Sequence, residues 1–326
     1  STKLIRDRVL ARGFHPQTIE KFLQELAWRE YFQRVWQAKG ELLFEDLKQP
    51  QADVAHHRMI AALLDAATGI ESIDQNILNF YQTGYLHNHV RMYIACLVCN
   101  IGKAHWRLPS QWMYAHLLDG DLASNTCSWQ WVAGSFASKK YFANQENINR
   151  FTHSNQQGTF LDVSMEDFPL PQVPAELTDT RPWELITNLP ASNTFHLDVT
   201  KPTLVYNSYH LDPTWRKDDD ANRVLLLEPS HFKKYPVSEQ VIQFILELSK
   251  NIPGIQVVTG EVSDLVARYG GYEIAEKMLM SREHPAFTHY PGRKAEREWM
   301  FPQVRGYYSS FFSFWKQCGK RHDRNK

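Results

Sequence analysis

The chain lacks an excess of either charge, a cysteine framework and any long apolar run, and each absence excludes a class of protein. Lys plus Arg and Asp plus Glu both number 36 in 326 residues, so any nucleic-acid contact must come from a local patch. Four cysteines do not make the framework of a small secreted domain. The longest apolar runs, such as the one near Met92, are shorter than the ~20 residues that a membrane span needs. Because Ser1 begins no signal-peptide pattern, we expect a cytoplasmic protein with no membrane partner.

Several local motifs are also missing. The sequence has no G-x-G-x-x-G, no P-loop, no internal repeat and no low-complexity tract. Cys96 and Cys99 lie in an apolar stretch that reads as helix, and Cys127 and Cys318 are remote from them. We therefore interpret the cysteines as buried structural thiols and predict no metal site.

The first part of the chain, from residue 2 to about 151, has the periodicity of helices. Residues 18–37 place apolar side chains at three- and four-residue spacing. Asp121 and Ser124 are candidate caps for a helix that begins near 123. Further helices are predicted at about 53–67, 72–83, 87–101, 110–118 and 123–132.

The rest of the chain has a different pattern. Prolines interrupt residues 155–202, which we interpret as a wrapping connector. Beyond it, a helical pattern at 237–251 alternates with apolar strand-like runs at 203–209, 223–229 and 255–261. The predicted fold is mainly α, a helical domain followed by a small α/β unit with a short parallel sheet. The predicted parts are 1–154, 155–202 and 203–326, the last ending in a basic tail from 316.

The stretch LLDGDLASNTCSWQWVAGS, residues 117–135, gathers carboxylates, an amide and two indoles. Asp119 and Asp121 occupy the first and third positions of a calcium loop, but Ala123, Ser124 and Gln130 do not fit its later positions. Two carboxylates alone are a weak signal for magnesium. The alternative is a purely structural role, in which Asp119 caps a helix and the indoles fill the core.

A second stretch, YLHNHVRM, has a pattern that core packing alone does not explain. Asn88 and Arg91 lie on one face of a predicted helix, with Met92 four residues after Asn88. An arginine on a largely apolar helix needs a carboxylate partner, and Asp119 and Asp121 are the candidates. Such a polar seam among aromatic residues suggests a bound polar heterocycle. The HNH string does not indicate an HNH nuclease, because helical periodicity replaces the hairpin that this motif needs.

Three segments together resemble one family. ELAWREYF, TGYLHNHVRM and AHWRLPSQWMYAHLLDGDLASNTCSWQWVAGS occur in the order seen in the FAD-binding helical domain of photolyases and cryptochromes. The resemblance covers roughly residues 18–150, and its last segment is long and specific. It implies FAD as the cofactor. The α/β unit of that family precedes the helical domain, whereas here it follows, and from this order we expect FAD alone without a second chromophore.

The resemblance assigns roles around the flavin. Asp121 would accept the imide hydrogen, and Asp119 would pair with Arg91 beside the ring. Asn125 would face the central-ring nitrogen, where a neutral amide favours repair over signalling. The remaining cofactor contacts implied by the resemblance are Asn88 and Arg29.

Other positions correspond to the substrate cavity and to an electron relay. Glu25 would hydrogen-bond a flipped pyrimidine dimer. His89 stands where relatives often use an arginine toward DNA phosphate. The cavity walls would come from Trp28, Met92 and Trp131. The first two relay members would be Trp129 and Trp106, the third would fall near Asp53, and the possible substitutes are Trp36, Trp112 and Tyr93.

The resemblance implies a light-driven enzyme that splits cyclobutane pyrimidine dimers, a photolyase. The absence of net positive charge and the His89 substitution favour single-stranded nucleic acid, with RNA left open, and a monomer is expected. A cryptochrome-like photoreceptor and a nucleic-acid binder without flavin remain alternatives. The candidate backbone contacts are Lys139, Lys140, Arg293, Lys294 and Arg297, for which ordinary solvated surface is an equal alternative.

Overall fold

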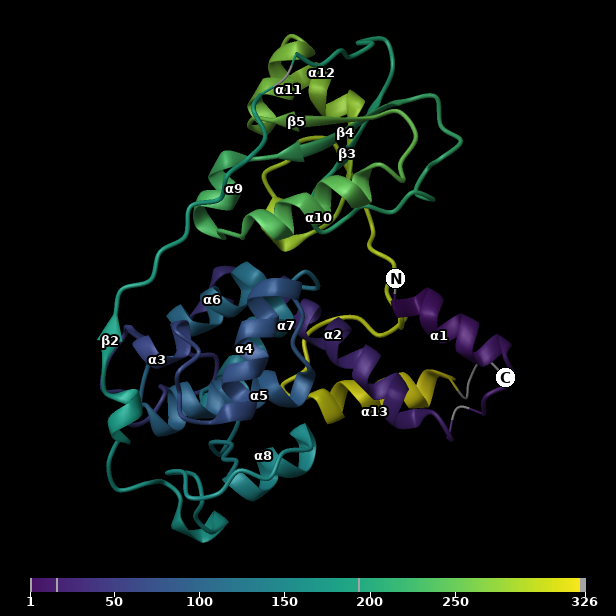
Figure 1. Ribbon diagram of the computed structural model, residues 1–326. Helices are drawn as coiled ribbons and strands as arrows, with labels where there is room; N and C mark the ends of the chain where they lie inside the picture. The colour runs from purple at the N-terminus through teal and green to yellow at the C-terminus, as the bar shows by residue number, and fades with distance from the viewer. Residues whose placement is uncertain (1, 16, 193, 323–326) are drawn as a thin grey trace.

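The structure, a computed structural model, describes residues 2–15, 17–192 and 194–322 and has two halves (Figure 1). The first half is helical, as the periodicity predicts. Its elements are α1 (Thr2–Ala11), α2 (Glu20–Lys39), the 3-10 helix η1 (Gly40–Phe44), β1 (Met59–Ile60), α3 (Ala61–Leu64), α4 (Glu71–Thr83), α5 (Asn88–Cys96), the π-helix η2 (Leu97–Ile101), α6 (Arg107–His116), α7 (Leu122–Ala133) and α8 (Gln145–Thr152).

The second half is built on a parallel sheet, reached through an irregular connector that carries η3 (Met165–Asp167), η4 (Ala175–Leu177) and β2 (Thr180–Arg181). The sheet has the order β5-β4-β3-β6-β7, and every neighbouring pair in it is parallel. The elements are β3 (Thr203–Tyr206), β4 (Asn222–Leu227), α9 (Pro229–Lys234), α10 (Glu239–Ser249), β5 (Ile255–Thr259), α11 (Val262–Arg268), α12 (Tyr272–Met278), β6 (Leu279–Arg282), η5 (Pro285–Phe287), β7 (Arg293–Ala295) and α13 (Phe311–His322).

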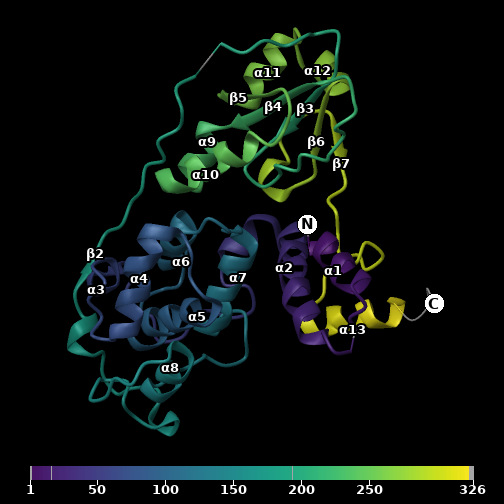
Figure 2. The ribbon, with the colours of Figure 1, turned by 45° about the vertical axis from the view of Figure 1, so that its right-hand side comes forward.

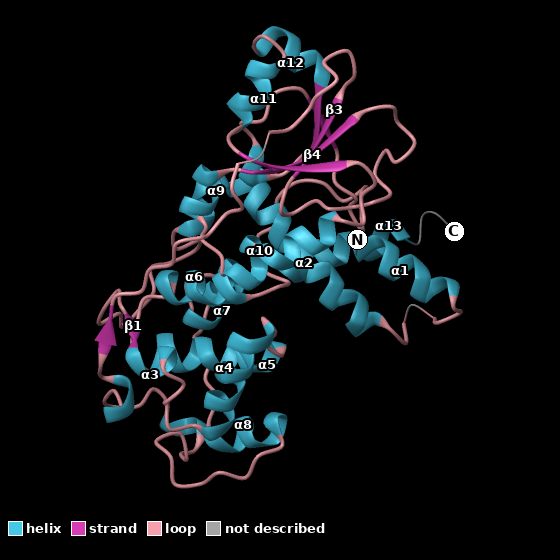
Figure 3. Cartoon of the chain, turned by 45° about the horizontal axis from the view of Figure 1, so that its top comes forward, coloured by secondary structure: helices cyan, strands magenta, loops and turns pink. Residues whose placement is uncertain are grey.

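Side-chain alternation along the strands divides the sheet into two apolar faces. Leu204 and Leu225 point to the core shared with α10 and the helical half. Val205 and Val224 point to the opposite core, which α11 and α12 cover. The chain adds strands on one side of β3 and then on the other, which is the doubly wound arrangement. The predicted fold class, mainly α with a small parallel sheet, is confirmed (Figure 3).

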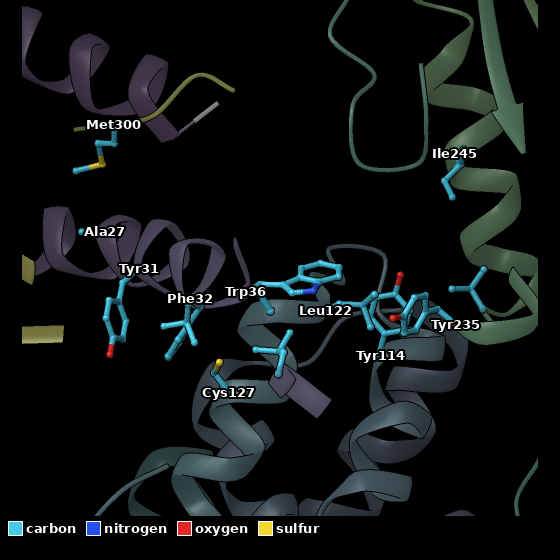
Figure 4. Packing of buried hydrophobic residues seen from close by; sticks show 14 of the residues in the cluster. Ala27, Tyr31, Phe32, Trp36, Tyr114, Leu122, Cys127, Tyr235, Ile245 and Met300 are labelled. Carbon is cyan, nitrogen blue, oxygen red and sulfur yellow. The ribbon is translucent and has the colours of Figure 1, made fainter. Parts of the chain in front are cut away.

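One continuous core joins the two halves. Trp36 of α2 and Leu122 of α7 belong to the same buried cluster as Tyr235 and Ile245 from the α/β half (Figure 4). At this junction the Tyr114 hydroxyl lies 2.8 Å from the hydroxyl of Tyr209. The C-terminal half of α2 is therefore enclosed on several sides.

The last helix returns to the helical half. After β7 the chain crosses back, and α13 packs along α2 (Figure 2). Cys318 is 1% exposed there. The prediction of a frayed basic tail from residue 316 is therefore wrong as far as His322, because the backbone is helical to that residue; residues 323–326 lie outside the described part.

Two sequence predictions need correction. The helix predicted at 53–67 is a short one, α3, because β1 pairs with β2 of the connector just before it. The sheet has two strands more than predicted, since β6 and β7 are only four and three residues long. Within the described residues, no helix combines the length and apolar character needed to cross a membrane.

Candidate active site

One cavity between α2, α5, α6 and α7 collects most of the predicted site residues. Its volume is about 480 Å³, within the usual range for ligand pockets. Of the residues predicted to contact the flavin, to line the substrate cavity or to begin the relay, only Trp106 and His89 are not part of the lining. The predicted residues that line it are Glu25, Trp28, Arg29, Asn88, Arg91, Met92, Asp119, Asp121, Asn125, Trp129 and Trp131.

The α5 side of the cavity is a polar and apolar stripe on one helix face. Asn88, Arg91 and Met92 are spaced so that all three point the same way. The guanidinium of Arg91 is fixed at two points: Nε donates to the Leu86 carbonyl at 2.9 Å, and Nη2 lies 3.0 Å from both carboxylate oxygens of Asp119. The ion pair expected from the sequence is present, and it places a positive group at the cavity wall.

The α7 side begins with a buried carboxylate. Asp121 is the N-cap of α7 and accepts the backbone N–H of Ser124 at 2.8 Å through Oδ1. Its Oδ2 accepts a hydrogen bond from the side-chain amide of Gln33 and lies 3.5 Å from Nη2 of Arg29. Asp121 is only 4% exposed. Since each carboxylate oxygen has two lone pairs, Asp121 retains the capacity to accept a further N–H from a ligand.

Asn125 lies one turn further along α7. Its amide nitrogen donates to the Ser110 carbonyl of α6 at 2.8 Å, which anchors the side chain at the cavity wall. This bond uses one of the two amide hydrogens, and the carbonyl oxygen is the group that can accept a ligand hydrogen.

Aromatic side chains form the rest of the wall. Trp129 is 2% exposed at the base, whereas Trp131 is 39% exposed. Trp28 is half-buried, and its ring stacks on Phe311 of α13 with centroids 3.8 Å apart and an interplanar angle of 11°. The C-terminal helix therefore supports this wall from behind, and Phe311 is not part of the lining.

The predicted relay has a buried second member and an altered third position. Trp106 is fully buried, and its indole N–H donates to Oδ1 of Asp46 at 2.7 Å. Asp53, where a third tryptophan would fall, pairs with Lys140 at 3.1 Å. Among the ring contacts of the described residues, none joins Trp106 or Trp129 to the candidate substitutes. The substitutes contact other groups: Trp36 packs on Phe44, Tyr209 and His284, Trp112 packs on Phe80 and Tyr81, and Tyr93 donates to Asn147.

His89 lies beside the cavity lining. Its ring stacks between His87, at 5.3 Å, and Phe151, at 4.3 Å. A contact between His89 and a phosphate stays a prediction. No group of three or more His, Cys, Asp or Glu side chains that could hold a metal ion occurs in the described part of the chain.

Sequence reasoning missed two side chains that organise the site. Gln33 bridges Asp121 to Arg297 of the α/β half, and its spacing of four residues from Arg29 was the available signal. Asp46 holds Trp106, and nothing near it in the sequence indicates this partner.

The residues present fit a flavin nucleotide. A flavin ring has an apolar benzenoid edge and an imide edge with an N–H donor, which correspond to the indole walls and to the buried carboxylate of Asp121. Arg29 and Arg91 add positive charge at the cavity wall, which suits an anionic cofactor. The cavity also combines apolar surface with a few converging polar groups, as nucleotide pockets do.

Comparison with known proteins agrees with this fit. Residues 22–178 match the family model of the FAD binding domain of DNA photolyase. The deoxyribodipyrimidine photo-lyase of Agrobacterium fabrum is 30% identical over 136 residues, 41% of this chain and 28% of that protein. The photo-lyase of Synechococcus is 31% identical over 121 residues, covering 36% and 25%. A cryptochrome DASH of Natronomonas pharaonis is 26% identical over 166 residues, covering 49% and 34%.

The matched region is confined to the first half. The chain spans about a quarter to a third of the length of these relatives. No solved structure matches it significantly. The matched segment includes every residue that lines the cavity, so its cofactor is FAD. Residues 22–178, from α2 into the connector, are therefore similar to the FAD-binding domain of the photolyase/cryptochrome family.

Proposed function

We propose that this chain uses FAD, a light-absorbing electron donor when bound and reduced, to split cyclobutane pyrimidine dimers in nucleic acid, with a preference for single strands. One observation carries the proposal. The cavity that holds the flavin-binding polar groups also contains Glu25, Trp28, Met92 and Trp131, the set expected to receive a dimer.

The polar groups would hold the cofactor without moving during the reaction. Asp121 accepts the imide N–H with a carboxylate already oriented by the α7 cap. Arg91, fixed by Asp119, offers a positive charge at the wall, where it stabilises negative charge on the bound ring. Asn125 presents a neutral carbonyl oxygen and no acidic proton. These three side chains therefore keep negative charge on the bound cofactor and do not protonate it, which suits electron transfer from the cofactor.

The more exposed side chains of the cavity suit a flipped pyrimidine dimer. Glu25 is exposed and Trp131 partly so, and both border the same space as the half-buried Trp28. Flat indole faces accept bases that leave the stack, while a carboxyl group hydrogen-bonds a pyrimidine edge. Met92 adds an adaptable apolar contact between them.

The preference for single strands is supported by the state of two basic candidates. Arg297 pairs with Glu283 at 2.8 Å, and Lys294 donates to the Phe287 carbonyl at 3.2 Å. Burial lowers the pKa of both groups. These cations are engaged internally, which leaves less charge to neutralise duplex phosphates. Flipping a dimer out of a duplex costs the free energy of its base pairs. In a single strand no base pairs are broken, so this cost is absent.

The experiment follows dimer loss from irradiated oligothymidine under blue light with chemically reduced protein. We expect light-dependent repair, faster on the single strand than on the same strand in a duplex, over a salt series. Protein in the dark and Glu25→Gln protein are the controls, the latter slower. A yellow protein without repair would refute the enzyme proposal and favour a photoreceptor, the alternative that the match to a cryptochrome DASH supports. Equal rates on both substrates would refute the preference alone.

A further inference from the structure

The buried indole of Trp106 donates a hydrogen bond to a partly buried carboxylate. Trp106 is fully buried, and its Nε1 donates to Oδ1 of Asp46 at 2.7 Å. The second oxygen of Asp46 accepts the backbone N–H of Gln51 at 3.1 Å. The side chain of Gln51 accepts the backbone N–H of Trp106 at 2.9 Å and donates to the Ala104 carbonyl at 2.9 Å. The loop 46–51 therefore fixes both the backbone and the ring of this tryptophan.

A structural role alone does not require an anion here. A buried indole N–H needs one acceptor, and a backbone carbonyl would supply it. A carboxylate adds a desolvation cost that a neutral acceptor avoids. What it adds chemically is a base at hydrogen-bonding distance from the only proton that an oxidised indole readily loses.

We propose, resting on the function proposed above, that Asp46 is the proton acceptor for Trp106 in the electron relay that reduces the flavin. Trp129 at the cavity loses one electron to light-excited oxidised flavin, which is the oxidant. One electron leaves the Trp106 ring and fills the vacancy on Trp129. The Nε1–H bond then breaks, its proton forms an O–H bond with Oδ1 of Asp46, and the electron pair of that bond stays on nitrogen. A neutral indolyl radical and a neutral carboxylic acid result.

The position of the missing third tryptophan explains why proton capture matters in this chain. Asp53 stands there, exposed and paired with Lys140, and it is not an electron donor. The electron deficit therefore rests on Trp106 unless another donor intervenes. Loss of the proton to Asp46 removes the positive charge, so that return of the electron from the flavin requires the proton to return as well.

The surroundings of Asp46 leave its carboxylate free for this task. Nε2 of His105 lies 3.8 Å from Oδ1, beyond hydrogen-bonding distance, and burial lowers the pKa of His105. The neighbouring Glu45 is neutralised by Arg107 at 2.8 Å. Asp46 is 23% exposed at its side chain, so solvent can take the proton from it later.

The test is transient absorption after a light flash on protein loaded with oxidised FAD. We expect the wild-type tryptophan radical to change from the cation spectrum to the neutral spectrum, with a slower change in D2O. Asp46→Asn removes the base and should slow this change on the order of tenfold or more. It should lower the yield of steady-state photoreduction in parallel. Asp46→Glu, which retains a carboxylate, should recover most of both.

Two controls distinguish a failure of the role of Asp46 from a failure of the proposed function. Glu45→Gln changes the adjacent, exposed carboxylate and should leave the radical kinetics unchanged. Dimer repair by chemically reduced protein bypasses the relay, so Asp46→Asn should repair at the wild-type rate. Failure of the wild type to repair would refute the proposed function. Normal repair together with a neutral radical that forms equally fast in Asp46→Asn, or with no solvent isotope effect in the wild type, would overturn the role of Asp46.

Discussion

Asp121 caps α7 with a buried carboxylate that we also expect to bind the cofactor, and two substitutions separate these roles. Asp121→Asn keeps the size of the side chain and an oxygen for the α7 cap, but removes the charge. The amide nitrogen of this asparagine cannot accept the hydrogen bond from Gln33, so that bond is lost in both variants, while Asp121→Ala removes the cap as well. We therefore expect both variants to lose affinity for FAD, and the alanine variant to lose more stability than the asparagine variant.

The magnitudes follow from the contacts. Loss of the cap costs about 0.5–2 kcal/mol, and an unpaired buried Gln33 amide costs about 1–3 kcal/mol. The free energy of unfolding of flavin-free Asp121→Ala should therefore fall by about 1.5–5 kcal/mol, whereas that of Asp121→Asn, which keeps the cap, should fall by about 1–3 kcal/mol. A hydrogen bond to a charged acceptor contributes about 1.5–3 kcal/mol, so either change should weaken FAD binding about ten- to a hundredfold. Arg29 adds little, because its side chain is 51% exposed.

The assay combines urea denaturation of the flavin-free protein with a fluorescence titration of FAD. Asp53→Asn is the matched control, since this carboxylate is exposed and lies outside the cavity lining. It should change neither quantity by more than about 0.5 kcal/mol. Wild-type FAD affinity in Asp121→Asn would refute the assignment of Asp121 to the flavin. A loss of stability in Asp121→Asn equal to that in Asp121→Ala would show that the charge itself stabilises the fold.

Three further changes test other parts of the structure. Trp129→Phe should block photoreduction of oxidised flavin but spare repair by chemically reduced protein; survival of both would refute the relay. Phe311→Ala removes the ring stacked on Trp28 and should cost about 3–5 kcal/mol in urea denaturation, against a smaller loss for Phe311→Leu. Burial lowers the pKa of His210 to about 3, and neither ring nitrogen has a partner. The unfolded chain therefore binds a proton below about pH 6.5 that the folded chain does not, and stability falls as pH falls; His210→Phe should reduce this slope by about 1 kcal/mol per pH unit between pH 6 and 5.

The parts of the site that the sequence predicted depend on local geometry. Asn88, Arg91 and Met92 share a helix face whatever the rest of the chain does, so their spacing was sufficient. The cap at Asp121 is likewise a property of the four residues that follow it. A carboxylate partner for Arg91 was also expected, since an arginine in an apolar setting needs one, and the resemblance singled out Asp119 from the two candidates Asp119 and Asp121.

The parts that the sequence did not predict are contacts over long separations. Gln33 and Asp121 are 88 residues apart, and Asp46 and Trp106 are 60 apart. Periodicity carries no information about such pairs. The strands β6 and β7 were missed for a different reason: they are short, and β7 consists of Arg293, Lys294 and Ala295, which have no apolar alternation to detect.

The arrangement of α2 connects the second half of the chain to the chemistry of the first. The middle of this helix presents Trp28 and Arg29 to the cavity, while Trp36 near its C-terminal end packs in the core shared with the sheet. Glu30, on the turn between them, is buried, pairs with Arg34 and accepts the backbone N–H groups of residues 300 and 301. A buried carboxylate in this position is stable only with those partners, because removing them would leave it uncompensated. The segment that follows the sheet thus fixes the rotation and depth of α2, and through α2 it fixes the position of the cavity wall.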